Sequence, residues 1–264
     1  MVSDGRLYTG RLKRATRALG LHTHLASLYW RLRIPRFMYA ASSRESVVHE
    51  IGDLDVRFPT ETYPQYRRFR WMHPELQLFE ELVDELEPGD VFYDVGAYLG
   101  WHSIVAASVD DTVDVVAFEP HPTTAARLRR VVAATGHDVD VREVALSDAA
   151  DTVSFAAAPD PAAHLADALD RDPVETITVE TAAGDDLVSD GRLPPPDVVK
   201  IDAEGADAAV LRGLRETIER HRPRRLYVEV HRDRRTITAL LEELGYDHAP
   251  LDVARPVLEA TPER

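Results

Sequence analysis

The 264-residue chain contains no cysteine and no long apolar run, and only two of its residues are lysines, Lys13 and Lys200. Without cysteine it can form neither a disulfide framework nor a cysteine-ligated zinc site. Because no run of about 18 apolar residues is present, no segment is predicted to span a membrane. The N-terminus also lacks the apolar core of a secretory signal, so we expect a cytoplasmic protein.

Positive charge is scarce over most of the chain. The net charge is −15, from 46 acidic and 31 basic residues. Nucleic-acid binding needs clustered basic residues, so the composition argues against a nucleic-acid partner. Acidic proteins with little lysine are typical of a cytosol rich in salt, although a GC-rich genome that favours arginine codons would produce the same bias.

Residues 1–40 are the exception, because they hold eight basic residues and a single acid, Asp4. Within them Leu21, Leu25 and Leu28 recur at helical spacing. We therefore expect residues 1–45 to form a basic amphipathic helical extension. Its leucine stripe is expected to pack on the protein itself. The alternative is peripheral contact with the inner face of an anionic membrane.

Two further units are expected before and within the main domain. Residues 46–89 predict a lead-in hairpin at 46–59 and an amphipathic helix at 75–86, both packing on the core. Residues 90–264 alternate between strand and helix patterns, which predicts an α/β domain with a doubly wound, mostly parallel sheet.

The expected elements of this domain follow from apolar runs and helical spacing. Strands are predicted at residues 91–95, 113–118, 139–146, 197–201 and 226–231, and helices at 123–134, 206–214 and 235–244. Further strand pairs are predicted from 153–156 with 176–179 and from within 246–258, and a loop or loose helix at 157–173.

The stretch VFYDVGAYLGWHS, residues 91–103, predicts a ligand site. A buried strand leads into Gly96 and Gly100, and a helix begins near Leu99. Such a turn at the carboxyl end of a sheet is typical of a nucleotide-type site. Tyr98 stands where a dinucleotide fingerprint has glycine, and its side chain would obstruct a pyrophosphate. Asp94 suits a cationic group, so the turn favours S-adenosylmethionine over a nicotinamide dinucleotide.

Acidic residues end the next two strands. Glu119 can accept hydrogen bonds from both hydroxyls of a ribose. Glu143 and Ala145 lie where an adenine is expected in a sheet of this order, although Ser147 and Asp148 are equally typical of a turn.

The densest group of candidate catalytic residues is Lys200, Asp202 and Glu204, in VVKIDAEG. Strand alternation places Lys200 and Asp202 on one face, and a buried lysine needs such a partner. Glu229 and His231 also share a face, and would meet Asp202 if their strands are neighbours. His231 is then a candidate general base, because imidazole ordinarily titrates near neutral pH. Asp202, Glu204, Glu229 and His231 could instead hold a hard divalent ion.

Five motifs together resemble the FkbM family of S-adenosylmethionine-dependent methyltransferases. They are DVGAYLGWHS (94–103), FEPHP (118–122), VALSD (144–148), VKIDAEGADAAVLRG (199–213) and YVEVH (227–231). The resemblance implies a class I methyltransferase fold, which is Rossmann-like, with a seven-stranded sheet whose last strand is antiparallel. It also implies O-methylation of a sugar, glycan, glycolipid or natural product, at a hydroxyl or a carboxylate.

The resemblance also assigns roles by matched position. Asp94, Gly96, Ala97 and Gly100 would line the methionine end of the cofactor, Glu119 would hold the ribose, and Asp202 would stand beside the methyl group. Tyr98 departs from the family, which commonly has a small polar residue there.

Methyl transfer to an alcohol requires two positioned reactants and a base. We expect Asp202 or His231 to be that base and Lys200 to hold the carboxylates in place. We expect no metal, although a divalent ion would be compatible with these residues. Two alternatives remain at this stage: an NAD-dependent oxidoreductase on a similar sheet, and a membrane-docked protein without catalytic activity.

Overall fold

The computed structural model describes residues 46–60, 62–70, 76–157, 175–231, 233–253 and 255–263. The expected basic helix at 1–45 lies outside these residues, as does the segment expected as a loop or loose helix, apart from residue 157. In the part of the chain that is described, no helix is both long and apolar enough to cross a membrane.

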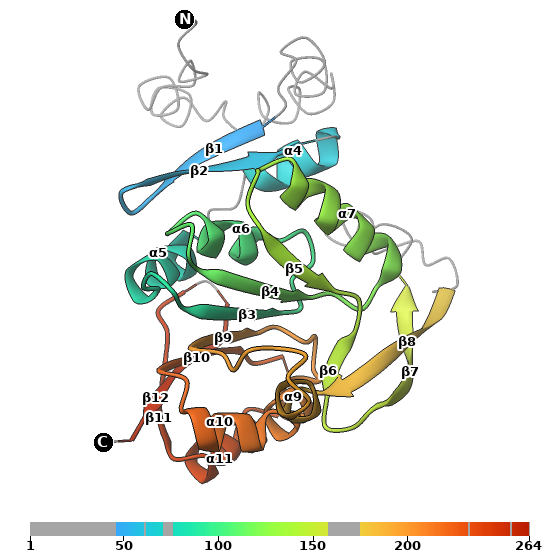
Figure 1. The fold of residues 1–264 in the computed structure, drawn as a ribbon, viewed down its shortest axis with the longest axis vertical. Helices are drawn as coiled ribbons and strands as arrows, with labels where there is room; N and C mark the ends of the chain where they lie inside the picture. The colour runs from blue at the N-terminus through green and yellow to red at the C-terminus, as the bar shows by residue number, and fades with distance from the viewer. Residues whose placement is uncertain are drawn as a thin grey trace, which may run out of the picture.

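A seven-stranded sheet in the order β11-β12-β10-β9-β3-β4-β5 forms the centre of the molecule (Figure 1). Its strands are β3 (Val91–Val95), β4 (Asp114–Phe118), β5 (Val139–Arg142), β9 (Val198–Ile201), β10 (Arg225–Glu229), β11 (Tyr246–Pro250) and β12 (Val257–Pro262). Strands β10, β9, β3, β4 and β5 are parallel to one another, whereas β12 is antiparallel to both β10 and β11. The expected doubly wound sheet with an antiparallel last strand is confirmed.

Helices cover both faces of this sheet, which explains why its central strands lack polar alternation. On one side lie α5 (Leu76–Glu85), α6 (Trp101–Ala107) and α7 (Pro122–Ala133), and on the other α9 (Asp207–Gly213), α10 (Arg215–His221) and α11 (Arg234–Glu243) (Figure 1). Phe92 packs with α5 and α6, and its neighbour Tyr93 packs into the cluster on the opposite face.

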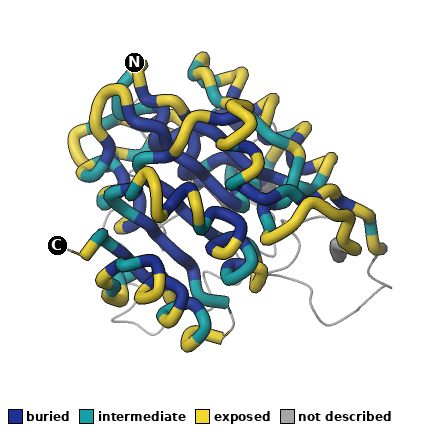
Figure 2. Tube along the Cα trace, turned by 60° about the horizontal axis from the view of Figure 1, so that its bottom comes forward, coloured by how far each residue is buried: buried dark blue, intermediate teal, exposed yellow. Residues whose placement is uncertain are grey.

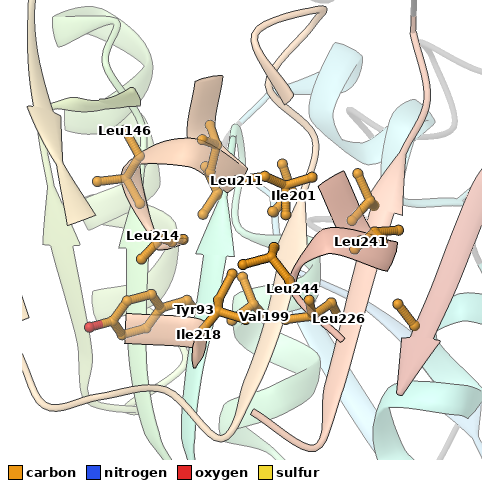
Figure 3. Close-up of a cluster of buried hydrophobic side chains, with 14 of the residues drawn as sticks. Tyr93, Leu146, Val199, Ile201, Leu211, Leu214, Ile218, Leu226, Leu241 and Leu244 are labelled. Atoms are coloured by element: carbon orange, nitrogen blue, oxygen red, sulfur yellow. The ribbon is translucent and has the colours of Figure 1, made fainter. Parts of the chain in front are cut away.

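The larger core cluster lies between the sheet and helices α9 to α11. Tyr93, Val199 and Ile201 contribute from the strands, and Leu211, Leu214 and Leu241 from the helices (Figure 3). Buried residues are concentrated in the central strands, whereas the outer faces of the helices are exposed (Figure 2). Burying one such aliphatic side chain contributes roughly 1.5–3 kcal/mol, so this cluster fixes the sheet on which the site is built.

The prediction of one strand at 139–146 is wrong. The chain leaves the central sheet after β5, and β6 (Ala145–Ser147) pairs in parallel with β8 (Glu175–Ala183). β7 (Asp151–Ala157) pairs antiparallel with β8 as expected, and the three strands form a separate sheet. The break occurs because Leu146 packs into the core beside α9, while Glu143 stays exposed.

The predicted hairpin is confirmed as β1 (Ser46–Ile51) and β2 (Leu54–Pro59), and the following amphipathic helix as α5. Three short helices were not expected: α4 (Tyr63–Arg70), α8 (Gly184–Ser189) and α10. The hairpin and α4 pack beside α6 in one buried cluster that includes Ile51, Phe58, Phe69 and Ile104. The lead-in region therefore lies next to the helix that follows the glycine turn.

Candidate active site

The glycine turn after β3 is clamped between the ends of two neighbouring strands. The N–H groups of Gly96 and Ala97 both donate to the carbonyl of Phe118 at the end of β4, each at 3.0 Å. Gly96 and Gly100 both have φ of 78°, which only glycine adopts without strain. A Cβ at Gly96 would lie 1.9 Å from the carbonyl oxygen of Asp202, so glycine is required for contact with the end of β9.

Asp94 lies fully buried behind this turn. Its Oδ2 accepts hydrogen bonds from the Ser103 N–H at 3.1 Å and the Ser103 hydroxyl at 2.7 Å, and its Oδ1 accepts one from Lys200 Nζ at 3.1 Å. Burial opposes ionisation of this carboxyl, but Lys200 and the Ser103 hydrogen bonds outweigh it, and the pKa of Asp94 is lowered. These contacts make Asp94 an anchor for the start of α6. Its predicted contact with a cofactor stays a prediction.

Lys200 connects the glycine turn with Asp202. Its ammonium donates to the carbonyl of Gly96 at 3.2 Å and lies 3.7 Å from Asp202 Oδ2. Burial disfavours the charged form, but Asp94 and Asp202 outweigh it and raise the pKa of Lys200. The predicted pairing with Asp202 is therefore present, although the hydrogen bond goes to Asp94, its register partner on β3.

Glu119 follows β4 and points its carboxylate at the same turn. It accepts hydrogen bonds from the backbone N–H groups of Tyr98, at 3.0 Å, and His121, at 2.9 Å. Burial raises its pKa to about 7, partly offset by these two hydrogen bonds. A carboxylate has about four acceptor positions, so two donors leave room for the hydroxyls of a ribose.

Glu143 and Ala145 lie in the segment that leaves the central sheet. Glu143 is exposed and pairs with Arg129 at 2.9 Å, whereas Ala145 begins β6 opposite Thr181 of β8. Both residues come after the end of β5. This strand is the neighbour of β4, which is followed by Glu119. Their contact with an adenine stays a prediction.

The carboxyl ends of β9 and β10 bring four carboxylates around the imidazole of His231. Its Nε2 lies 3.3 Å from Asp202 Oδ1, 3.6 Å from Glu229 Oε1 and 3.7 Å from Glu204 Oε2, and its Nδ1 lies 3.4 Å from Asp207 Oδ2. The expected convergence of Asp202, Glu229 and His231 is confirmed, because β9 and β10 are parallel neighbours. Burial and the nearby Asp202 raise the pKa of Glu229.

Three residues of the site were not identified from the sequence. Ser103 holds Asp94, Asp207 lies behind His231, and Arg255 Nη1 lies 3.1 Å from both carboxylate oxygens of Glu229. An acid in the first turn of a helix, such as Asp207, is a recognisable capping signal. Arg255 comes from the connection between β11 and β12 and carries no local signal.

A single metal ion could reach this cluster on distance alone. Asp202, Glu229 and His231 each offer a ligand atom, all within 4.8 Å of one another. Arg255, however, already places a guanidinium on both oxygens of Glu229 and lies 3.9 Å from Asp202. An ion bound there would have to displace this cation from Glu229.

The strand order, the antiparallel β12 and the glycine turn after β3 together define a class I methyltransferase fold. Residues 94–247 match the methyltransferase FkbM domain, and the chain belongs to this family of methyltransferases. This membership speaks against both alternatives, the oxidoreductase and the non-catalytic protein.

Two known proteins illustrate the similarity. The chain is 30% identical over 203 residues to the hexuronic acid methyltransferase AglP of Haloferax volcanii, a match covering 76% of this chain and 81% of that protein. Its fold resembles that of methyltransferase FkbM from Methylobacillus flagellatus KT, with a TM-score of 0.51 and 15% identity. That match covers 75% of this chain and 53% of the other, so this chain spans about half of its length.

Proposed function

We propose that this protein transfers a methyl group from S-adenosylmethionine to a hydroxyl oxygen of a sugar, in a free saccharide, a glycan or a glycolipid. The observation that carries the proposal is the contact between the glycine turn and Asp202, with His231 next to it. A turn fit for the cofactor and a cluster fit for removing a proton therefore share one edge of the sheet. The sugar class is supported by the similarity to AglP, whose name states a hexuronic acid substrate.

The residues at the turn fit this cofactor. Gly96, Ala97 and Gly100 would form the backbone surface against its methionine end, and Glu119 would accept hydrogen bonds from its ribose. When bound, the cofactor supplies a methyl carbon on a sulfonium, which bonds to the acceptor oxygen as the carbon–sulfur bond breaks. The proton of the acceptor hydroxyl must then leave.

The acidic cluster would receive that proton and orient the acceptor. Asp202 and His231 are the candidate bases, Glu204 is a further candidate at the solvent side, and Lys200 fixes Asp202 against the turn. A carboxylate acceptor would need no base, and the surrounding acids would repel it. The cluster therefore favours a hydroxyl.

Binding and turnover test the proposal in sequence. Calorimetry should show that S-adenosylhomocysteine binds and that NAD does not. Asp202→Asn and His231→Asn should each lower kcat by about 10²–10⁴-fold, the usual contribution of a general base, and leave S-adenosylhomocysteine affinity nearly unchanged. Asp190→Asn, at an exposed acid outside the site, is the matched control.

Mild alkali distinguishes the type of product, because it cleaves a methyl ester and leaves a methyl ether intact. Methylated sugar that resists alkali supports the hydroxyl assignment. Complete release of the methyl group would contradict it, and unchanged turnover after both substitutions would remove Asp202 and His231 from the mechanism.

A further inference from the structure

Tyr98, between the two glycines of the turn, has a backbone conformation that tyrosine rarely adopts. Its φ is 52°, in the left-handed region, and Gly96 and Gly100 on either side have φ of 78°. A Cβ makes this region sterically unfavourable, and only glycine, asparagine and aspartate visit it routinely. Such strain persists where the surrounding structure enforces it. The contacts of Tyr98 must therefore supply the constraint.

The ring of Tyr98 packs outside the turn, against the lead-in region. It contacts a buried group, here called the lead-in cluster, to which β1, β2 and α4 contribute Val47, Ile51, Val56, Phe58 and Phe69. Each of these five side chains is at most 6% exposed. Because such an interior is close-packed, a ring seated on it has little freedom to move, and it restrains the backbone to which it is attached.

The backbone N–H of Tyr98 points to the opposite partner, Glu119. It donates to Glu119 Oε2 at 3.0 Å, and the N–H of His121 donates to Oε1 at 2.9 Å. Each oxygen of the carboxylate therefore has one backbone donor, and the two donors together fix the plane of the group. In the proposed function this carboxylate holds the ribose.

The turn cannot change at Tyr98 alone, because both of its ends are fixed. The N–H of Ala97 donates to the carbonyl of Phe118 at 3.0 Å, and the N–H of Gly100 donates to the carbonyl of Ala97 at 2.7 Å. A residue that left the left-handed region would have to rotate the peptide group between Ala97 and position 98. That peptide group carries the N–H that orients Glu119.

We propose that Tyr98 is a positioning residue for the cofactor: the lead-in cluster holds its ring, and the ring holds the turn in the conformation that directs the Tyr98 N–H at Glu119. The proposal rests on the proposed function and deepens it, because it makes the hairpin and α4 a support of the ribose site. The packing of the ring offsets the strain of the backbone. No contact between the ring and the cofactor is needed.

Substitutions that separate the ring from the backbone test this role by calorimetry. Tyr98→Ala removes the ring and keeps the Cβ, so nothing holds the left-handed conformation, and affinity for S-adenosylhomocysteine should fall by about tenfold. Tyr98→Asn also removes the ring, but asparagine adopts this conformation with little strain, so affinity should stay within about threefold of the unmodified protein. Tyr98→Phe keeps the ring and should retain affinity.

Stability distinguishes this role from packing alone. Tyr98→Ala and Tyr98→Asn both lose the contact with the lead-in cluster, so urea unfolding should show that both are destabilised. A residue that only packs would make the two variants alike in affinity as well. Equal affinity of these two variants, weak or strong, would overturn the proposal. A tenfold loss in Tyr98→Phe would also overturn it, because the ring would then not be the group required.

Arg222 supplies the matched control, because its φ is also 52° and it lies at the end of α10, outside the site. By the same conformational preference, Arg222→Asn should be more stable than Arg222→Ala, and neither should change affinity for S-adenosylhomocysteine. A difference in affinity between these two variants would show that strain far from the turn weakens binding, and would remove the local role of Tyr98.

A second measurement needs no cofactor. Burial raises the pKa of Glu119 to about 7; the N–H groups of His121 and Tyr98 and the charge of Lys200 offset part of this rise, whereas Asp94 adds to it. Carbon-13 NMR of the side-chain carboxyl, assigned by its loss in Glu119→Gln, should show a higher pKa in Tyr98→Ala and an unchanged pKa in Tyr98→Asn. The same pKa in both variants would contradict the proposal.

Failure of the proposed function gives a different result. In that case S-adenosylhomocysteine would not bind the unmodified protein, while the pKa of Glu119 would still separate Tyr98→Ala from Tyr98→Asn. If the unmodified protein binds S-adenosylhomocysteine and the two variants differ in neither affinity nor pKa, the cofactor assignment stands and only the role of Tyr98 is wrong.

Discussion

The two halves of the site's edge differ in how their carboxylates are satisfied. At the ends of β3 and β4, Asp94 and Glu119 are buried and each receives at least two hydrogen bonds from the chain itself. At the ends of β9 and β10, Asp202 Oδ1 has no hydrogen-bond donor among the described residues, and the side chain of Glu204 is 80% exposed.

We propose that this difference reflects two kinds of ligand. A half whose polar groups are already satisfied is preorganised and suits a ligand that never varies, such as a cofactor. A half with unsatisfied acceptors and partial exposure can bind a donor that arrives from solvent, such as a sugar hydroxyl. Three substitutions test this contrast. The first is in the half at the ends of β3 and β4, which we call the rigid half.

The largest effect is expected from Gly96→Ala. Its Cβ would lie 1.9 Å from a backbone oxygen of Asp202, and φ at this position is 78°. We expect a loss of about 5 kcal/mol or more in the free energy of unfolding, or no folded protein at all. Gly89→Ala is the matched control, because its φ is 89° but nothing lies within 4 Å of the added atom.

Gly89→Ala should cost about 1–2 kcal/mol, the strain of a left-handed residue alone. Urea unfolding curves measure both variants. Equal losses would show that the contact between the glycine turn and Asp202 is not as tight as described.

A smaller but still large effect is expected from Lys200→Met. The substitution leaves the Asp94 carboxylate buried without its cation, and removing one partner of a buried pair typically costs about 3–5 kcal/mol. The double variant Lys200→Met/Asp94→Asn should recover much of this loss, because no buried charge is then unpaired. Arg215→Met, at the exposed pair with Glu219, should cost less than about 1 kcal/mol.

Thermal unfolding monitored by circular dichroism compares the three variants. No recovery in the double variant would mean that Lys200 stabilises the fold mainly through its hydrogen bonds to the carbonyls of Val95 and Gly96.

The smallest effect concerns pH and Glu119, whose pKa is raised to about 7. In the proposed function the ionised carboxylate holds the ribose hydroxyls, so affinity for S-adenosylhomocysteine should fall as pH decreases below 7, at most about tenfold per pH unit. The stability of the unliganded protein should follow the opposite sign. The pKa of Glu119 in the folded protein exceeds its value of 4.5 in the unfolded chain. The contribution of Glu119 to stability is therefore complete below pH 4.5 and is lost as pH rises through 7.

Glu119→Gln should flatten both pH profiles. Calorimetric titrations at pH 6, 7 and 8 measure the first, and urea unfolding from below pH 4.5 to above pH 7 measures the second. An unchanged pH dependence in this variant would assign both effects to another group.

The sequence predicted the elements of the rigid half well, because each depended on local signals. The apolar and aromatic residues that lead into Asp94 predicted β3, the two glycines predicted the turn, and the position of Glu119 after the β4 pattern predicted an acid at this edge. The prediction failed at residues 139–146, where an apolar pattern continued across a change of sheet. Periodicity reports which residues are buried, but not which strand they pair with.

The half of the site at the ends of β9 and β10 was predicted only in part. Lys200, Asp202 and His231 were identified from strand alternation, whereas Asp207 and Arg255 were missed. Arg255 reaches Glu229 only because β12 inserts next to β10, and that pairing joins segments with no shared local pattern.

By itself, the sequence determined the class of this protein. Short local motifs predicted the parallel sheet, the glycine turn and the carboxylates of a methyltransferase. Only the tertiary structure decided which of those groups meet. The register of β3 against β9 made Asp94 the hydrogen-bonding partner of Lys200, and the start of α9 placed Asp207 behind His231. Contacts between distant segments depend on how the whole core packs, and no local pattern records that.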